Sequence, residues 1–212
     1  MFEGKASTMR SNQTGRTPGR PKGNTDSRAV LLGAASALFM EFGYEPVSLN
    51  QIAERAGVTK ASIYYYFNSK SELFTASVTE MMGRICMYTR QLLEQGGTLR
   101  ERLVKVAEAK MAVTHVEFES MMREAIASLT ESQRLAIRKA EHGIHEVLAE
   151  CFAQAAARGE MRGGEDPLLL AHAFSSLLMV GSRDTSDAPF VERSDLARRI
   201  VDLFWQGAGP VA

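Results

Sequence analysis

Residues 48–70 read SLNQIAERAGVTKASIYYYFNSK, and this stretch decides the fold. Its first half predicts a two-turn amphipathic helix that meets Gly57, a residue suited to a tight turn. Its second half predicts another short helix, which Thr59 can cap. Two short helices joined by a tight turn form a helix-turn-helix, and the second helix of this motif enters the major groove of DNA. The apolar stripe of the first helix is Leu49, Ile52, Ala53 and Ala56, and the inner face of the second is Ile63 and Phe67.

The polar and aromatic side chains on the outer face of this motif are the predicted DNA contacts. Short hydroxyls can bond phosphates or bases, a lysine can reach a guanine edge or a phosphate, and a tyrosine ring can pack on thymine methyl groups. Ser69 can cap a further helix, whose N-terminus together with the lysine that follows favours phosphate. The predicted DNA-binding residues are Ser48, Asn50, Thr59, Lys60, Ala61, Ser62, Tyr64, Tyr65 and Lys70, together with Arg20 and Lys22 upstream.

This stretch resembles the DNA-binding region of the TetR family of repressors, and the resemblance covers roughly residues 26–75. It implies a homodimer that places two recognition helices in successive major grooves of a palindromic, double-stranded DNA operator. Tyr65 departs from the family, which often has histidine there, so the base preference stays open. The matching residues are Ala34, Leu38, Phe39, Gly43, Tyr44, Ile52, Ala53, Ala56, Gly57, Val58, Ile63, Tyr64, Tyr66, Phe67, Ser69, Lys70 and Leu73.

The segment before the first helix is polar and basic. Residues 1–25 are rich in Gly, Ser, Thr, Asn and basic residues without apolar periodicity, which predicts a flexible arm. Gly19-Arg20-Pro21-Lys22 resembles the basic arm of some family members, which could enter the minor groove, but an ordinary solubilising tail explains it equally well. The charge supports a basic head, since residues 1–70 carry nine basic and five acidic residues, a net +4, and the remainder carries −4.

The rest of the chain reads as helix, which predicts an all-α fold. Four capping boxes, Ser48/Gln51, Ser69/Glu72, Thr98/Glu101 and Thr130/Gln133, mark helix starts, and glycines mark several ends. About nine helices are expected, at residues 26–43, 48–56, 60–66, 70–95, 98–114, 117–128, 131–158, 167–181 and 194–206. The predicted organisation is the arm at 1–25, a helix-turn-helix domain at 26–70 and a helical effector-binding and dimerisation domain at 71–212.

The C-terminal domain carries soft and aromatic side chains that could line an adaptable apolar pocket for a small-molecule effector, or could simply form the core. His115 could orient such an effector, although an ordinary histidine is the simpler interpretation. The sequence does not identify the effector. The candidate pocket residues are Met82, Cys86, Met111, His115, Phe118, Met122 and Phe152.

Two further features of this domain have a chemical interpretation. His142 and His145 lie at i, i+3, a spacing that can hold a transition metal, but the charged segment around them favours a solvated face. We therefore expect no metal site and no cofactor. Cys86 or Cys151 could act as a redox sensor, but nothing nearby in the sequence clearly lowers a thiol pKa, and two cysteines are too few for a disulfide framework.

The last two expected helices carry apolar faces. In the TetR family such helices pair across a two-fold axis as a four-helix bundle, so we expect these faces to form the dimer interface, although they could be buried within one subunit. The candidate interface residues are Leu170, Phe174, Leu177, Leu178, Ile200, Leu203 and Phe204.

Composition and motifs narrow the function. Hydrophobic residues make up 45% of 212 residues, ample for a core, and the longest apolar-rich run, residues 168–180, is broken by polar residues. We therefore expect a soluble, cytoplasmic protein without membrane contact. Catalytic motifs such as a Walker loop or an H-E-x-x-H zinc site are absent from the sequence, which argues against an enzyme. An effector-free architectural DNA-binding protein stays open as an alternative.

These patterns together predict a one-component regulator, most simply a repressor that a ligand releases from DNA. Ligand binding among the fourth to seventh helices would shift the fourth helix, whose start at Ser69-Lys70 follows the recognition helix. A ligand can do this only by binding the non-DNA state more tightly. Activation instead of repression is an open alternative.

Overall fold

A computed structural model describes residues 24–112, 115–182 and 193–209. Within this part of the chain the regular elements are all helices, as predicted, and each of the nine expected helices is present with its ends shifted by at most three residues. The helices are α1 Asn24–Phe42, α2 Leu49–Ala56, α3 Lys60–Tyr66, α4 Lys70–Leu93, α5 Leu99–Met111, α6 His115–Ala125, α7 Glu131–Ala157, α8 Pro167–Ser182 and α9 Arg193–Ala208, with a short 3-10 turn at Ile126–Ser128.

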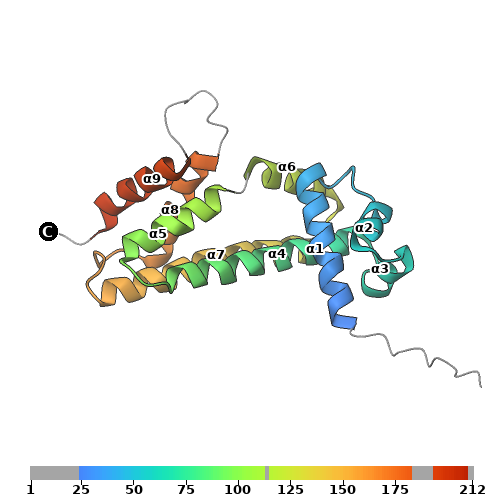
Figure 1. The fold of residues 1–212 in the computed structure, drawn as a ribbon, viewed down its shortest axis with the longest axis horizontal. Coiled ribbons are helices and arrows are strands. Elements are labelled where there is room, and N and C mark those ends of the chain that lie inside the picture. Colours follow the sequence, from blue (N-terminus) through green and yellow to red (C-terminus); the bar gives the residue numbers. More distant parts are fainter. Residues whose placement is uncertain (1–23, 113–114, 183–192, 210–212) are drawn as a thin grey trace, which may run out of the picture.

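The helices form a head and an elongated body (Figure 1). Helices α1, α2 and α3 gather at one end, while α5, α8 and α9 pack at the other. The two long helices α4 and α7 lie side by side along the body and connect the two ends. Helix α6 packs against α1 at the boundary between body and head. None of the described helices is long and apolar enough to cross a membrane.

The helix starts follow the polar caps in the sequence. In the capping box before α2, the Ser48 hydroxyl accepts the Gln51 amide at 3.3 Å, and the Gln51 side chain accepts the Ser48 amide at 2.8 Å. Thr98 and Thr130 form equivalent reciprocal boxes with Glu101 and Gln133.

The predicted box before α4 is only half correct. The Ser69 hydroxyl caps the Glu72 amide at 3.1 Å, but the Glu72 carboxylate accepts instead from the backbone of Asn68, at 2.8 Å, and from its side-chain amide, at 3.0 Å. Asn68 carries a second donor beside the helix start, and the carboxylate of Glu72 takes both of its N–H groups.

Two apolar cores support the fold, and α4 contributes to both. In the head core, the rings of Phe39 and Phe74 meet edge to face with centroids 5.1 Å apart. In the body core, the rings of Phe152 and Phe204 lie with centroids 5.6 Å apart. Close-packed cores have low compressibility and transmit strain, so α4 can carry a displacement between the head and the body, as can α7, which also contributes to both cores. It buries Leu73, Phe74, Val78 and Met82 in the head core and Leu92 and Leu93 in the body core.

Most residues of the predicted dimer interface lie in or against the core of the subunit itself, and the interface stays a prediction. Phe174, Leu178, Ile200 and Phe204 are buried in the body core of the subunit itself, and Leu170 and Leu177 pack against that core from its edge. Of the seven predicted residues, only Leu203 is well exposed, at 60%. An apolar stripe at helical spacing indicates a face that is covered, but it does not indicate whether the cover comes from the same chain or from another one.

The residues of the predicted effector pocket belong to two apolar cores. Met111 and Phe152 are buried in the body core, against which Cys86 packs. Met82 is buried in the head core, against which Phe118 and Met122 pack. These six side chains therefore divide between the two cores, and a shared effector pocket stays a prediction. The side chain of His115 lies outside the described residues.

Candidate nucleic-acid interface

The turn between α2 and α3 requires a glycine. Gly57 has φ +65°, in the left-handed region that side-chain-bearing residues rarely adopt, and its amide bonds the Glu54 carbonyl at 3.1 Å. The next amide, of Val58, bonds the Ala53 carbonyl at 3.0 Å. Both bonds satisfy carbonyls at the end of α2, so the chain reverses within two residues and α3 starts immediately after the turn.

Helix α3 is short, and its cap and its inner side chains hold it in place. The Thr59 hydroxyl accepts the Ser62 amide at 3.2 Å and shares a hydrogen bond with the Ser62 hydroxyl at 2.9 Å. On the inner face, Ile63 is fully buried and Phe67 nearly so. A seven-residue helix is marginal alone, so these contacts with the head core fix its orientation.

The outer face of α3 presents the residues predicted to bind DNA. Lys60 and Ala61 are exposed, and the rings of Tyr64 and Tyr65 are 52% and 72% exposed. An aromatic side chain that is nearly three-quarters exposed is costly in water and is typical of a binding residue. The Tyr65 ring meets the Tyr66 ring edge to face with centroids 4.9 Å apart, which restricts its rotamers before any partner binds.

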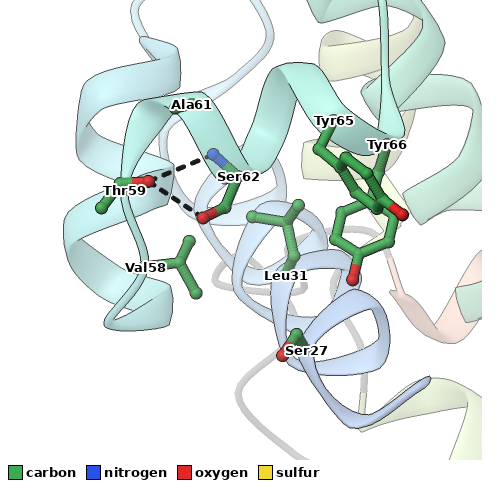
Figure 2. A pocket seen from close by; sticks show the side chains of 8 residues that line it. All are labelled: Ser27, Leu31, Val58, Thr59, Ala61, Ser62, Tyr65 and Tyr66. Carbon is green, nitrogen blue, oxygen red and sulfur yellow. Dashed lines mark hydrogen bonds between the residues drawn. The ribbon is translucent and has the colours of Figure 1, made fainter. Parts of the chain in front are cut away.

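A hollow of about 400 Å³ lies between this helix and the start of α1, and Figure 2 shows the side chains that line it. Its walls combine hydroxyl groups with apolar side chains, a mixture that suits phosphate oxygens and sugar edges. The hollow therefore belongs to the predicted DNA-binding surface, because four of its lining residues are predicted DNA contacts, namely Thr59, Ala61, Ser62 and Tyr65. The lining residues are Ser27, Leu31, Val58, Thr59, Ala61, Ser62, Tyr65 and Tyr66.

The other predicted contacts are placed differently. Ser48 and Asn50 are exposed at the start of α2. Lys70 is turned inward: its ammonium donates to the Glu45 carbonyl at 3.1 Å and lies 4.5 Å from the centre of the Tyr44 ring. Burial lowers the pKa of Lys70 from its ordinary value. The ammonium has three N–H donors, so these two contacts leave donor capacity for a phosphate. Arg20 and Lys22 lie outside the described residues.

Sequence reasoning missed a clamp that joins the body to this surface. One carboxylate oxygen of Glu124, at the end of α6, accepts the backbone amides of Tyr44 and Glu45 at 2.9 and 3.2 Å. Lys70 also bonds this turn, through the carbonyl of Glu45. Gly43 makes room for the carboxylate, since a Cβ there would lie 2.6 Å from Glu124 Oε2, and its φ of +86° also favours glycine.

Parts of this chain are similar to known proteins. Residues 31–76 match the family described as bacterial regulatory proteins, tetR family. The transcriptional activator FasR of Mycolicibacterium smegmatis is 37% identical over 84 residues, which cover 40% of this chain and 38% of FasR. The transcriptional repressor KstR of the same organism is 28% identical over 184 residues, which cover 83% of this chain and 87% of KstR. The regulator FadR of Bacillus subtilis, solved in complex with stearoyl-CoA, has a TM-score of 0.65 at 19% identity, with 84% of this chain and 98% of FadR covered.

The matches differ in how much of the chain they cover. The chain spans less than half the length of the first curated relatives it matches, with 38%, 41% and 49% of their lengths covered. The likeness to FadR shows that the fold is shared through the body as well.

Proposed function

Because the chain is a member of the TetR family of bacterial regulatory proteins, we propose that it is a one-component transcriptional regulator that binds DNA through α3. The observation that carries this proposal is the outer face of α3, where Tyr64 and Tyr65 are exposed on a helix that is capped and anchored from below. A recognition helix must present such side chains with its backbone held rigid, because base readout depends on their position. No catalytic activity is part of this proposal.

We further propose that the regulator acts as a homodimer on a palindromic operator. Two copies related by a two-fold axis place their α3 helices on two half-sites, so the symmetry of the DNA follows that of the protein. The candidate contact between the copies is the outward side of α8 and α9, where Leu169 and Leu203 are 58% and 60% exposed. Exposed leucines of this kind on neighbouring helices gain free energy when a second copy covers them.

Repression is the proposed direction of regulation, and a small-molecule effector is the proposed signal. The match to the repressor KstR extends over 83% of this chain, whereas the match to the activator FasR covers 40% of it. The clamp supplies a route for the signal. An effector that moves α6 or α4 would displace Glu124 or Lys70, and both hold the turn that orients α2 and α3.

The experiment is a fluorescence-anisotropy titration of the protein against DNA upstream of its own gene, beside a scrambled duplex, at several salt concentrations. We expect tight, salt-sensitive binding to the native sequence. Tyr65→Ala should weaken it by about 1–3 kcal/mol, roughly five- to 150-fold, because a groove-facing ring is lost. Tyr88→Ala is the matched control, since Tyr88 is also an exposed tyrosine, at 53%, but lies on α4.

Three results would contradict the proposal. One is equal affinity of the wild-type protein for the native and the scrambled duplex, which would indicate an architectural role without sequence recognition. Another is the absence of binding to either duplex at low salt. The third is an equal loss of affinity in Tyr65→Ala and in the Tyr88→Ala control, which would remove the recognition role from α3.

A further inference from the structure

Three of the four histidines of the sequence meet on one side of the body. His142 and His145 lie one turn apart on α7, and His172 reaches them from α8. Candidate ligand atoms of the three imidazoles, one from each ring, all lie within 4.8 Å of one another. The ring centroids of His145 and His172 are 4.2 Å apart, and His142 lies 6.4 and 6.2 Å from the other two.

This geometry is close to that of a three-histidine metal site. Transition metals bind imidazole nitrogen at 2.0–2.1 Å, which sets the nitrogens of a tetrahedral site about 3.4 Å apart. Side-chain rotations that move each nitrogen by about an ångström therefore suffice to bring the three nitrogens onto one ion. His172 is exposed and the other two are half-buried, so an ion can reach the site from solvent and a fourth position can stay open to water.

We propose that His142, His145 and His172 bind one divalent first-row transition-metal ion of the class of Zn²⁺, Ni²⁺, Cu²⁺ or Co²⁺. The sequence predicted a solvated face here because the segment around His142 and His145 is strongly charged. The packing of α8 on α7 adds the third ligand from a position 27 residues further along the chain. Three imidazoles and no carboxylate ligand favour these ions over Mg²⁺ and Ca²⁺, which require oxygen ligands.

One charged side chain near the site favours metal binding and another opposes it. The Glu146 carboxylate lies 3.7 Å from Nε2 of His142, so it can orient that ring while Nδ1 faces the metal. The ammonium of Lys110 acts electrostatically on His145 and opposes a bound cation. Only an ion that binds imidazole tightly can overcome the repulsion from Lys110, so weakly bound ions are further disfavoured.

A bound ion would fasten α8 to α7, which in turn packs along α4 (Figure 1). Metal binding itself does not depend on the proposed function. An effect of the metal on DNA affinity would rest on that function, since α4 begins beside the recognition helix. The two are tested separately, because the binding assay contains no DNA.

The test is a titration of the full chain, purified without a polyhistidine tag, with Co²⁺ followed by visible absorption and then displaced by Zn²⁺. We compare the wild type with His172→Ala and His145→Ala. The control variant carries His115→Ala, Cys86→Ser and Cys151→Ser, which removes the remaining histidine and both thiols but keeps the three proposed ligands. Circular dichroism checks that each variant is folded, and His172→Asn replaces any variant that is not.

We expect one ion per chain in the wild type and in the control variant, with d–d bands of a site rich in nitrogen ligands and no binding of Mg²⁺. Loss of a direct ligand should weaken affinity by more than about 100-fold, beyond the 10- to 100-fold typical of outer-shell partners. Three results would overturn the proposal. The wild type fails to bind one ion per chain, folded His172→Ala still binds one ion per chain, or the folded control variant no longer binds it.

Discussion

Removal of the Glu124 carboxylate should loosen the joint between the body and the DNA-binding head. The carboxylate oxygen Oε2 accepts both the Tyr44 and the Glu45 amides, so Glu124→Ala leaves two backbone donors without their partner. Hydrogen bonds to charged groups contribute about 1.5–3 kcal/mol each when protected from water. One of these bonds is partly buried and the other exposed, so we expect a combined loss of about 1–3 kcal/mol in the free energy of unfolding.

Glu124→Gln separates charge from geometry. A glutamine oxygen can still accept the two amides but without the negative charge, so the expected loss is about half as large, roughly 0.5–1.5 kcal/mol. The control is Glu119→Ala, because Glu119 is also an exposed glutamate on α6. The assay is urea denaturation followed by circular dichroism, with hydrogen exchange of the Tyr44 and Glu45 amides as the local readout.

Hydrogen exchange of the Tyr44 and Glu45 amides shows directly whether the Glu124 carboxylate holds the turn. If the clamp holds the turn, exchange at Tyr44 and Glu45 accelerates in Glu124→Ala and to a smaller extent in Glu124→Gln, while Glu119→Ala matches the wild type. An unfolding midpoint and amide exchange in Glu124→Ala that equal those of the wild type would refute the clamp as a stabilising contact. They would also remove the proposed route from α6 to the head.

Three further predictions concern Gly43, Leu203 and Lys110. Gly43→Ala places a Cβ against Glu124 at a φ of +86° and should lower the free energy of unfolding by at least about 1 kcal/mol, whereas Gly43→Ala combined with Glu124→Ala should recover the part due to the close contact, which urea denaturation can measure. Leu203→Glu should convert the proposed dimer to a folded monomer in sedimentation experiments, because Leu203 is 60% exposed, and an unchanged dimer would remove α9 from the interface. Burial lowers the pKa of Lys110 from 10.5 to about 8, so between these pH values the folded chain binds fewer protons than the unfolded chain, and the free energy of unfolding should rise with pH. Lys110→Met should therefore be about 1–3 kcal/mol more stable than the wild type at pH 7 and lose this advantage above pH 10, in urea denaturation with a chelator present. A stability difference between variant and wild type that does not change with pH would contradict the burial of this charge.

The head could be predicted from the sequence because its signals are local. Gly57 in the left-handed region, the Thr59 cap and the Ser48 capping box each act within three or four residues, and the sequence places them at fixed spacings. The exposed face of α3 follows from the burial of Ile63 and Phe67 at the helical period.

The contacts of the body could not be predicted because they join distant residues. Glu124 bonds a turn 80 residues earlier, and nothing in the sequence around either residue indicates the pairing. His172 joins two histidines on another helix for the same reason. The buried faces of α8 and α9 have the spacing of a dimer interface, but Phe174 and Phe204 meet within one subunit with centroids 5.1 Å apart. Helical periodicity indicates that a face is covered and leaves the identity of its cover undetermined.

The most direct test of the account is a selection of duplex DNA from a random library by the wild-type protein, followed by sequencing. We expect enrichment of an inverted repeat whose half-sites lie about one helical turn of roughly 10 base pairs, or a multiple of it, apart. Such a repeat follows if two copies of α3 read two symmetric half-sites. Sequences indistinguishable from the starting library would contradict sequence-specific recognition by this face.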